Sequence, residues 1–207
     1  MFRHLPTSCL IVLCGCGGST TGGGGAADAG GGLGGVTLDD PYLSRLEYFT
    51  AQQQRVLGDA DKDGLPELAV FSEPMGGQVT YAGQVSIGVS HPNRQLAIFG
   101  DAALTFDFAE GIATGKATDF FGTTLAGQVA PYAGVVALTA QSIAPRMDVG
   151  FDGALSGPAT VTLGGALDGQ FFGSQAQAFV ASALDTTVNF DGFDRPATVV
   201  LILEETP

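Results

Sequence analysis

The stretch that decides the fold is Gln78–Ala109, which reads QVTYAGQVSIGVSHPNRQLAIFGDAALTFDFA. In 78–90, mostly apolar residues hold the odd positions, and polar or small residues hold the even ones. After a break at 91–94, apolar residues again keep to one parity, with Phe99 as the one large exception. Side chains alternate across a strand, so each run has one apolar and one polar face. Because the break contains Pro92, which favours a turn, we expect two long antiparallel neighbours.

Short alternating segments continue beyond Ala109, separated by glycine-rich turns. The candidate strands are Ile112–Phe120, Leu125–Ile143 as one strand or two with an interruption at Pro131, Met147–Leu155, Thr160–Leu163, Leu167–Phe172, Gln175–Ala183, Val188–Phe190 and Ala197–Leu203. Glycine inside such segments is typical of the bends that barrel closure requires. The pattern favours an all-β fold, either a closed antiparallel barrel or a sandwich.

A short amphipathic helix is expected before the strands. Asp40 and Pro41 read as an N-cap followed by proline at the first helical position, and Gly58 ends the segment. Apolar residues recur at helical spacing over 42–57. The final strand, 198–203, is apolar on both faces, so one face must be covered. We expect the helix to lie across the barrel wall or an open end and to cover it.

Composition bounds the size and partners of the protein. The 207 residues suffice for one sizeable domain, and hydrophobic residues make up 45% of them. The formal charge is −13, with 8 basic against 21 acidic residues. Such a balance argues against binding to nucleic acid or to anionic lipid through a basic patch.

The N-terminus resembles that of a bacterial lipoprotein. Arg3 and a short apolar run precede Leu13-Cys14-Gly15-Cys16, a sequence similar to a lipobox, in which cleavage before the cysteine exposes it for lipidation. We therefore expect a signal peptide over 1–15 and a covalent lipid, including palmitate, on Cys16. The region 16–38 follows as a flexible, disordered tether, because 11 of the 19 residues in 17–35 are glycine.

An acidic loop within the segment 39–75 carries the clearest metal-binding pattern. Asp59, Asp61 and Asp63 alternate ahead of Gly64, and Glu67 stands at the ninth position of the loop. Carboxylates arranged in this way suit Ca²⁺, which takes 6–8 oxygen ligands. The loop resembles the calcium loop of FG-GAP repeats, although only one copy is present. The alternative is a solvated acidic loop that turns the chain.

A family resemblance covers about 76–207. The segment 169–176, GQFFGSQA, resembles the late G-x-F-Y-G-x-x-A motif of the transferrin-binding protein B type of lipoprotein β-barrel. The motif positions are Gly169, Phe171, Phe172, Gly173 and Ala176, with phenylalanine at 172 where tyrosine is usual. Segments 79–83, 100–108, 112–120 and 155–157 also fit. The resemblance implies an eight-stranded antiparallel up-and-down barrel with a filled interior, lipid-anchored in the outer membrane. It would be displayed on the cell surface, which we expect, or on the periplasmic side.

The resemblance also implies a function, because relatives bind host or environmental proteins, in some cases for iron acquisition. We expect a monomeric, non-enzymatic surface lipoprotein that binds an extracellular protein or solute, with no cofactor apart from the candidate Ca²⁺. His91 is the one histidine left after signal cleavage, and no free cysteine remains, so the sequence offers no His-based triad or thiol chemistry. The alternatives are a calcium-dependent adhesion module and a lipocalin-like small-molecule carrier.

Overall fold

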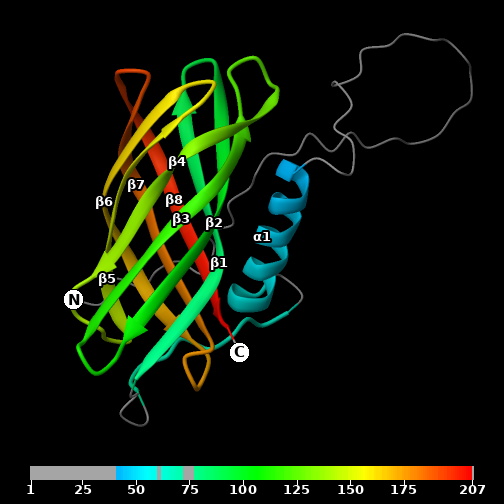
Figure 1. Cartoon of the computed structure of the whole chain (residues 1–207). Helices are drawn as coiled ribbons and strands as arrows, with labels where there is room; N and C mark the ends of the chain where they lie inside the picture. Colours follow the sequence, from blue (N-terminus) through cyan, green and yellow to red (C-terminus); the bar gives the residue numbers. More distant parts are fainter. Residues whose placement is uncertain (1–40, 60–61, 72–76, 207) are drawn as a thin grey trace, which may run out of the picture. The chain divides into compact units, whose positions relative to one another are not determined.

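The computed structural model describes residues 41–59, 62–71 and 77–206 (Figure 1). Within them lie one helix, α1 (Pro41–Leu57), and eight strands. The strands are β1 (Gln78–His91), β2 (Arg94–Asp107), β3 (Ile112–Thr123), β4 (Val129–Ala140), β5 (Arg146–Ser156), β6 (Thr160–Phe172), β7 (Ala178–Phe190) and β8 (Phe193–Glu205). Each strand pairs antiparallel with the next, and β1 pairs with β8. The expected eight-stranded up-and-down barrel is therefore confirmed.

The first hairpin has the register that the alternating sequence indicates. Pairing of β1 with β2 runs without interruption from Gln78 opposite Asp107 to His91 opposite Arg94. The apolar parity of both strands is buried, and the other parity is largely polar or small. In a closed barrel one face of every strand looks inward, so this parity sets which residues form the core.

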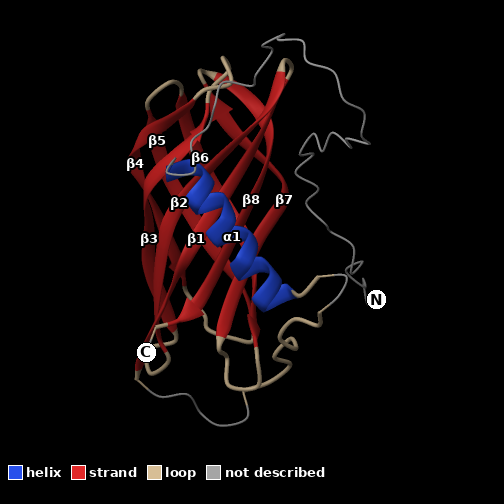
Figure 2. Cartoon of the chain, turned by 90° about the vertical axis from the view of Figure 1, so that its right-hand side faces the viewer, coloured by secondary structure: helices blue, strands red, loops and turns tan. Residues whose placement is uncertain are grey.

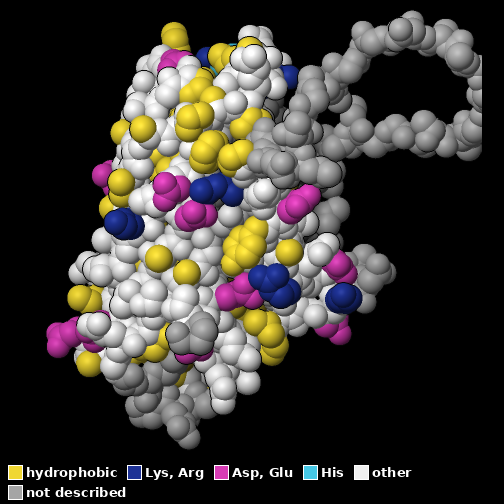
Figure 3. All heavy atoms as spheres, turned by 45° about the vertical axis from the view of Figure 1, so that its right-hand side comes forward, with side chains coloured by type: hydrophobic (Ala, Val, Ile, Leu, Met, Phe, Trp, Pro, Cys, Tyr) yellow, Lys and Arg dark blue, Asp and Glu magenta, His cyan; other side chains and the backbone are white. Residues whose placement is uncertain are grey.

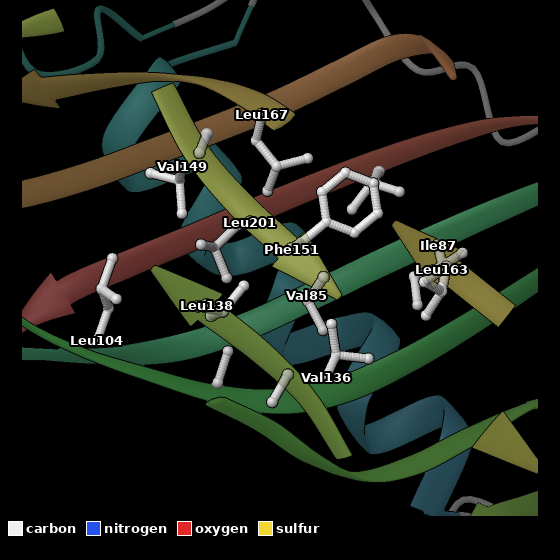
Figure 4. Close-up of a cluster of buried hydrophobic side chains, with 14 of the residues drawn as sticks. Val85, Ile87, Leu104, Val136, Leu138, Val149, Phe151, Leu163, Leu167 and Leu201 are labelled. Carbon is white, nitrogen blue, oxygen red and sulfur yellow. The ribbon is translucent and has the colours of Figure 1, made fainter. Parts of the chain in front are cut away.

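Apolar side chains fill the barrel interior from end to end. The middle is mainly aliphatic, with Phe151 among the side chains from several strands that converge there (Figure 4). One end is aromatic: Phe171 packs against Phe106 and Phe179 with ring centroids 4.9 Å apart in each case, and Tyr81 joins them. The void at the centre amounts to about 10 Å³ and is lined only by apolar residues. That volume is close to the minimum for a single water molecule.

At three places the sequence suggested a break inside what the structure shows to be a single strand. The segments on either side of Gly164-Gly165 form one strand, β6, which stays paired with β5 throughout but changes register against β7 between Thr162 and Asp168. The two segments expected in β7 are likewise one strand, with a register shift against β8. Such irregularities bend a strand without ending it, as closure requires.

The third difference is Pro131, which lies inside the single strand β4 instead of interrupting it. Pairing of β4 with β5 begins only at Ala133, so Pro131 lies in the first part of β4, which is not yet paired with β5. A proline lacks the N–H that a ladder hydrogen bond needs, and this position does not demand one.

Helix α1 lies against the outer wall of the barrel, over the side formed by β8, β1 and β2 (Figure 2). A second apolar cluster, which we call the outer cluster, joins them: Phe49, Val56, Phe99, Phe172, Ala178, Val180, Val200 and Ile202. Phe99, the exception on the polar face of β2, is fully buried, with Tyr42 and Phe49 edge-on to its ring. The helix therefore covers the outward apolar face of β8, as expected. No helix in the described ranges is long and apolar enough to cross a membrane.

Candidate functional site

The acidic loop begins as a turn that caps the end of α1. Gly58 has φ +79 and donates its N–H to the Gln54 carbonyl, which ends the helix. The N–H of Asp59 donates to the Lys62 carbonyl, and the Lys62 N–H donates to the Asp59 carboxylate at 2.9 Å. The Asp59 side chain therefore already closes the turn. Asp63 forms an isolated bridge with Gly58, and Asp61 lies outside the described residues.

Glu67 is drawn to the barrel wall. Its carboxylate lies 2.6 Å from the Arg146 guanidinium of β5, and Arg146 also bonds the Gln170 side chain. Gln170 in turn donates to the Leu68 carbonyl. The described ranges contain no group of three His, Cys, Asp or Glu side chains placed to hold a metal ion. The Ca²⁺ hypothesis stays untested, but its Glu67 ligand has another partner in this structure.

The family-motif residues build the β6–β7 turn. A Cβ at Gly169 would collide with the Phe179 ring, so glycine lets that ring enter the barrel. Phe171 points inward and is fully buried, whereas Phe172, on the opposite parity, joins the outer cluster beneath α1. Two adjacent residues of β6 therefore contribute one aromatic ring to the barrel interior and one to the outer cluster, because neighbouring side chains of a strand point to opposite faces.

Gly173 and Ala176 hold this turn against neighbouring segments. Gly173 has φ +85 and donates its N–H to the Pro66 carbonyl, while Ala176, at φ 55, accepts a 2.5 Å hydrogen bond from the Tyr81 hydroxyl. Burial raises the pKa of Tyr81, so the hydroxyl stays protonated and able to donate. All five motif positions thus have structural contacts. Cys16, the predicted lipidation site, lies outside the described residues.

A groove of about 520 Å³ lies between α1 and strands β1–β3. Its size falls in the range of small-ligand sites. The pairing register places two rows of residues across its floor. One row is Ala82, Ala103 and Lys116, and the other is Gln84, Asp101 and Thr118. Tyr48 of α1 lines the groove from the helix side, with 48% of its surface exposed. We call this feature the helix groove.

Two ion pairs fix α1 beside the helix groove. Arg45 donates to both carboxylate oxygens of Asp101, at 2.8 and 3.1 Å, and Arg55 donates to both of Glu204, at 3.0 and 2.6 Å. Basic and acidic side chains stand next to each other on this face (Figure 3). The hydrogen bonds from Arg55, and also from Gln52, lower the pKa of Glu204. This carboxylate is therefore held charged, as a structural ion-pair partner.

Two buried amide oxygens near α1 lack hydrogen-bond partners among the described residues. Gln84 is 4% exposed and Gln52 is fully buried, yet the Oε1 atom of each has none among the described residues. Gln52 lies over Gly83, where any Cβ would meet its amide and the Ile202 carbonyl. Buried polar atoms are rarely left unpaired, so each calls for an explanation.

Sequence reasoning missed the helix groove. The sequence feature that marks the groove is a set of small residues, Ala82, Gly83 and Ala103, in β1 and β2. The outward-facing residues that adjoin them along these strands are polar. Only the register between three strands and the docking of α1 bring Tyr48 and Gln84 to one place, and neither can be read from local spacing.

The fold and groove define an eight-stranded barrel with an external helix as its one added element among the described residues. Comparison with protein-family models finds no match for the chain, and comparison with curated proteins finds none either.

Proposed function

We propose that this protein is a non-enzymatic outer-membrane lipoprotein, anchored through a lipid on Cys16, whose barrel binds an extracellular protein or solute on its outer surface. One observation carries the location of binding. The barrel interior is filled by side chains and leaves a void of only about 10 Å³. Ligand cavities measure about 300–1,000 Å³, so the outside of the barrel is the available surface.

The anchor part of the proposal rests on the sequence. Leu13 to Cys16 resembles a lipobox, and the glycine-rich region 16–38 provides reach between a membrane and the folded part. More than one acyl chain on a single residue gives stable membrane attachment where one chain gives only reversible binding. The resemblance to transferrin-binding protein B type barrels is in keeping with surface display and with a protein or solute ligand. A filled barrel also disfavours the lipocalin-like alternative, which needs a hollow one.

Metabolic labelling tests the anchor. We expect full-length chain expressed in a diderm bacterium to incorporate labelled palmitate and to fractionate with the outer membrane. Cys16→Ser should abolish both, whereas Cys14→Ser, a matched change two residues upstream, should leave both intact. Equal labelling of the two variants, or none in the unaltered chain, would contradict the anchor.

Protease added to intact cells tests display. We expect cleavage of the lipoprotein without cell lysis, while a periplasmic control protein stays intact. Protection of the chain until the outer membrane is permeabilised would contradict surface exposure and leave a periplasm-facing lipoprotein.

A further inference from the structure

We propose that the end of the barrel with the turns at 92–93 and 191–192 binds a small oxyanion, such as phosphate, pyrophosphate, sulfate or a small polycarboxylate. This inference deepens the proposed function, on which it rests, because it names a class of solute and the place where it binds. The site consists of three basic side chains, Arg94, His91 and Arg195, which we call the basic row.

Strand register brings these three side chains to one rim. His91 lies opposite Arg94 at the end of the β1–β2 ladder, and directly opposite side chains share a face. The last pair of β1 with β8 is Val89 opposite Ala197, and His91 and Arg195 each lie two residues beyond it. The basic row therefore has the inward parity of the buried Val89 and Ala197. Adjacent strands lie about 5 Å apart, so the row crosses β2, β1 and β8 in neighbouring steps. Basic side chains and a histidine side chain lie together at the upper end of the molecule in Figure 3.

Arg195 is a partly buried cation without a counter-charge. It makes no ion pair or hydrogen bond with any residue that the structure describes, and its Nε atom is buried. The two Nη nitrogens remain at the surface as donors that a ligand can reach. The guanidinium carbon lies 5.5 Å from the centroid of the Phe193 ring, a cation–π contact that orients the group. Because a partly buried charge without a partner is costly, this guanidinium calls for an anion.

His91 and Arg94 also have donors to spare. The Nδ1 atom of His91 accepts the Asn93 N–H at 3.3 Å, so the ring proton is on Nε2, which can donate to a ligand. Arg94 donates from one Nη atom to the Thr124 carbonyl at 3.3 Å, and its other N–H groups have no acceptor within the described ranges. A guanidinium presents parallel N–H groups that match two oxygens of one oxyanion.

The other arginines of the described residues are used differently. Arg45, Arg55 and Arg146 each meet a carboxylate, at 2.6–2.8 Å. Arg94 and Arg195 meet none in the part of the chain that the structure describes, although the chain has 21 acidic residues against 8 basic ones. Like charges on neighbouring strands repel one another, so an oxyanion held between them relieves this repulsion and supplies the missing acceptors.

The carboxylates of the nearby β7–β8 turn have other donors. Asp191 accepts the Thr160 N–H at 2.8 Å, and Asp194 accepts the Asn189 side chain at 3.1 Å. Asp194 also precedes Arg195 directly in β8 and so has the opposite parity. The net charge of −13 repels an extended anionic surface, whereas a small anion needs only the local field of the basic row. The ligand is therefore a small solute and not a membrane.

Isothermal titration calorimetry on the purified full-length chain, in neutral detergent at low ionic strength, tests the inference. The probes are phosphate, pyrophosphate, sulfate and citrate. For pyrophosphate we expect a Kd of about 1 mM, which should rise about tenfold in Arg195→Gln and beyond measurement in the double variant Arg94→Gln/Arg195→Gln. The ring signals of His91 should shift in NMR spectra during the same titration. Because Arg195 has no acceptor, Arg195→Gln should not lower the melting temperature; if it does, the exposed Arg94→Gln alone decides, and should raise the Kd several-fold.

Lys62→Gln is the matched control, because it removes one positive charge from an exposed residue that is in no ion pair of the described residues. It should leave the Kd unchanged. A second arm separates a soluble anion from a lipid headgroup: the Cys16→Ser chain, which cannot be lipidated, should not float with phosphatidylglycerol vesicles. The inference is overturned by heat with none of the four anions, by an equal Kd in the Lys62 and basic-row variants, or by vesicle capture without binding of a soluble anion. None of these results alters palmitate labelling of Cys16 in the unaltered chain, so failure here is distinct from failure of the proposed function.

Discussion

Truncating Phe99 should release helix α1 from a barrel that stays folded. Phe99 is fully buried on the outside of β2, and the rings of Tyr42 and Phe49 lie edge-on to it with centroids 5.4 and 5.7 Å away. Changing a buried phenylalanine to alanine costs about 3–5 kcal/mol. An isolated helix of 17 residues is only marginally stable, so α1 depends on this packing. The loss therefore falls on the docking of α1 first.

Hydrogen exchange measures this release directly. In Phe99→Ala we expect the amides of α1 to exchange at least about 100-fold faster, which corresponds to the lower end of the packing loss, while amides of β4 and β5 stay protected. Phe193→Ala is the matched substitution at an exposed site and should change stability by about 0.5 kcal/mol or less. Unchanged exchange in α1, or simultaneous loss of protection in β4 and β5, would refute the assignment of Phe99 to helix docking.

Three further outcomes follow from single contacts. The pKa of Glu204 lies below its ordinary value of 4.5, so its stabilising ion pair with Arg55 is present above pH 4.5 and is lost as the pH falls through the lowered pKa. Acid titration below about pH 4.5 should therefore loosen α1, and Glu204→Gln should flatten the dependence of α1 docking on pH. Tyr81→Phe should lower stability in urea unfolding by about 1–3 kcal/mol, because it leaves the Ala176 carbonyl buried without its donor. Calorimetry with Ca²⁺ should show little binding heat, because a Ca²⁺ ion would have to compete with Arg146 for the carboxylate of Glu67; measurable heat that is lost in Asp59→Ala would support the calcium hypothesis.

The sequence alone predicted the features that depend on local alternation. The parity of 78–108 determines the inward face of β1 and β2, and the two-sided apolar character of 198–203 predicts that something covers β8. Phe99 stood out in the sequence only as an exception on the polar face, and the structure shows that it lies beneath α1. Each of these inferences needs only the two-residue period of a strand and the cost of exposing apolar surface.

Features that depend on pairing between distant segments were missed. Gly164 and Gly165 look like a strand break locally, yet β6 continues because its ladder with β5 is intact there. The spacing that makes Glu67 a candidate metal ligand gives no sign of its ion pair with Arg146, 79 residues away. A register or an ion pair of this kind is decided by barrel closure, which local sequence does not encode.

A closed and filled barrel leaves little choice of where recognition can occur. Every strand has two neighbours, so no edge is open for strand addition, and the interior has no room for a ligand. Any ligand of this barrel would therefore contact the end loops or the outer wall. On the wall, α1 covers the apolar patch of β8 and, by standing beside β1–β3, forms a groove that the half-exposed Tyr48 lines from the helix side. The helix therefore completes the outer core and also forms one wall of the helix groove, which is why releasing it should disrupt both.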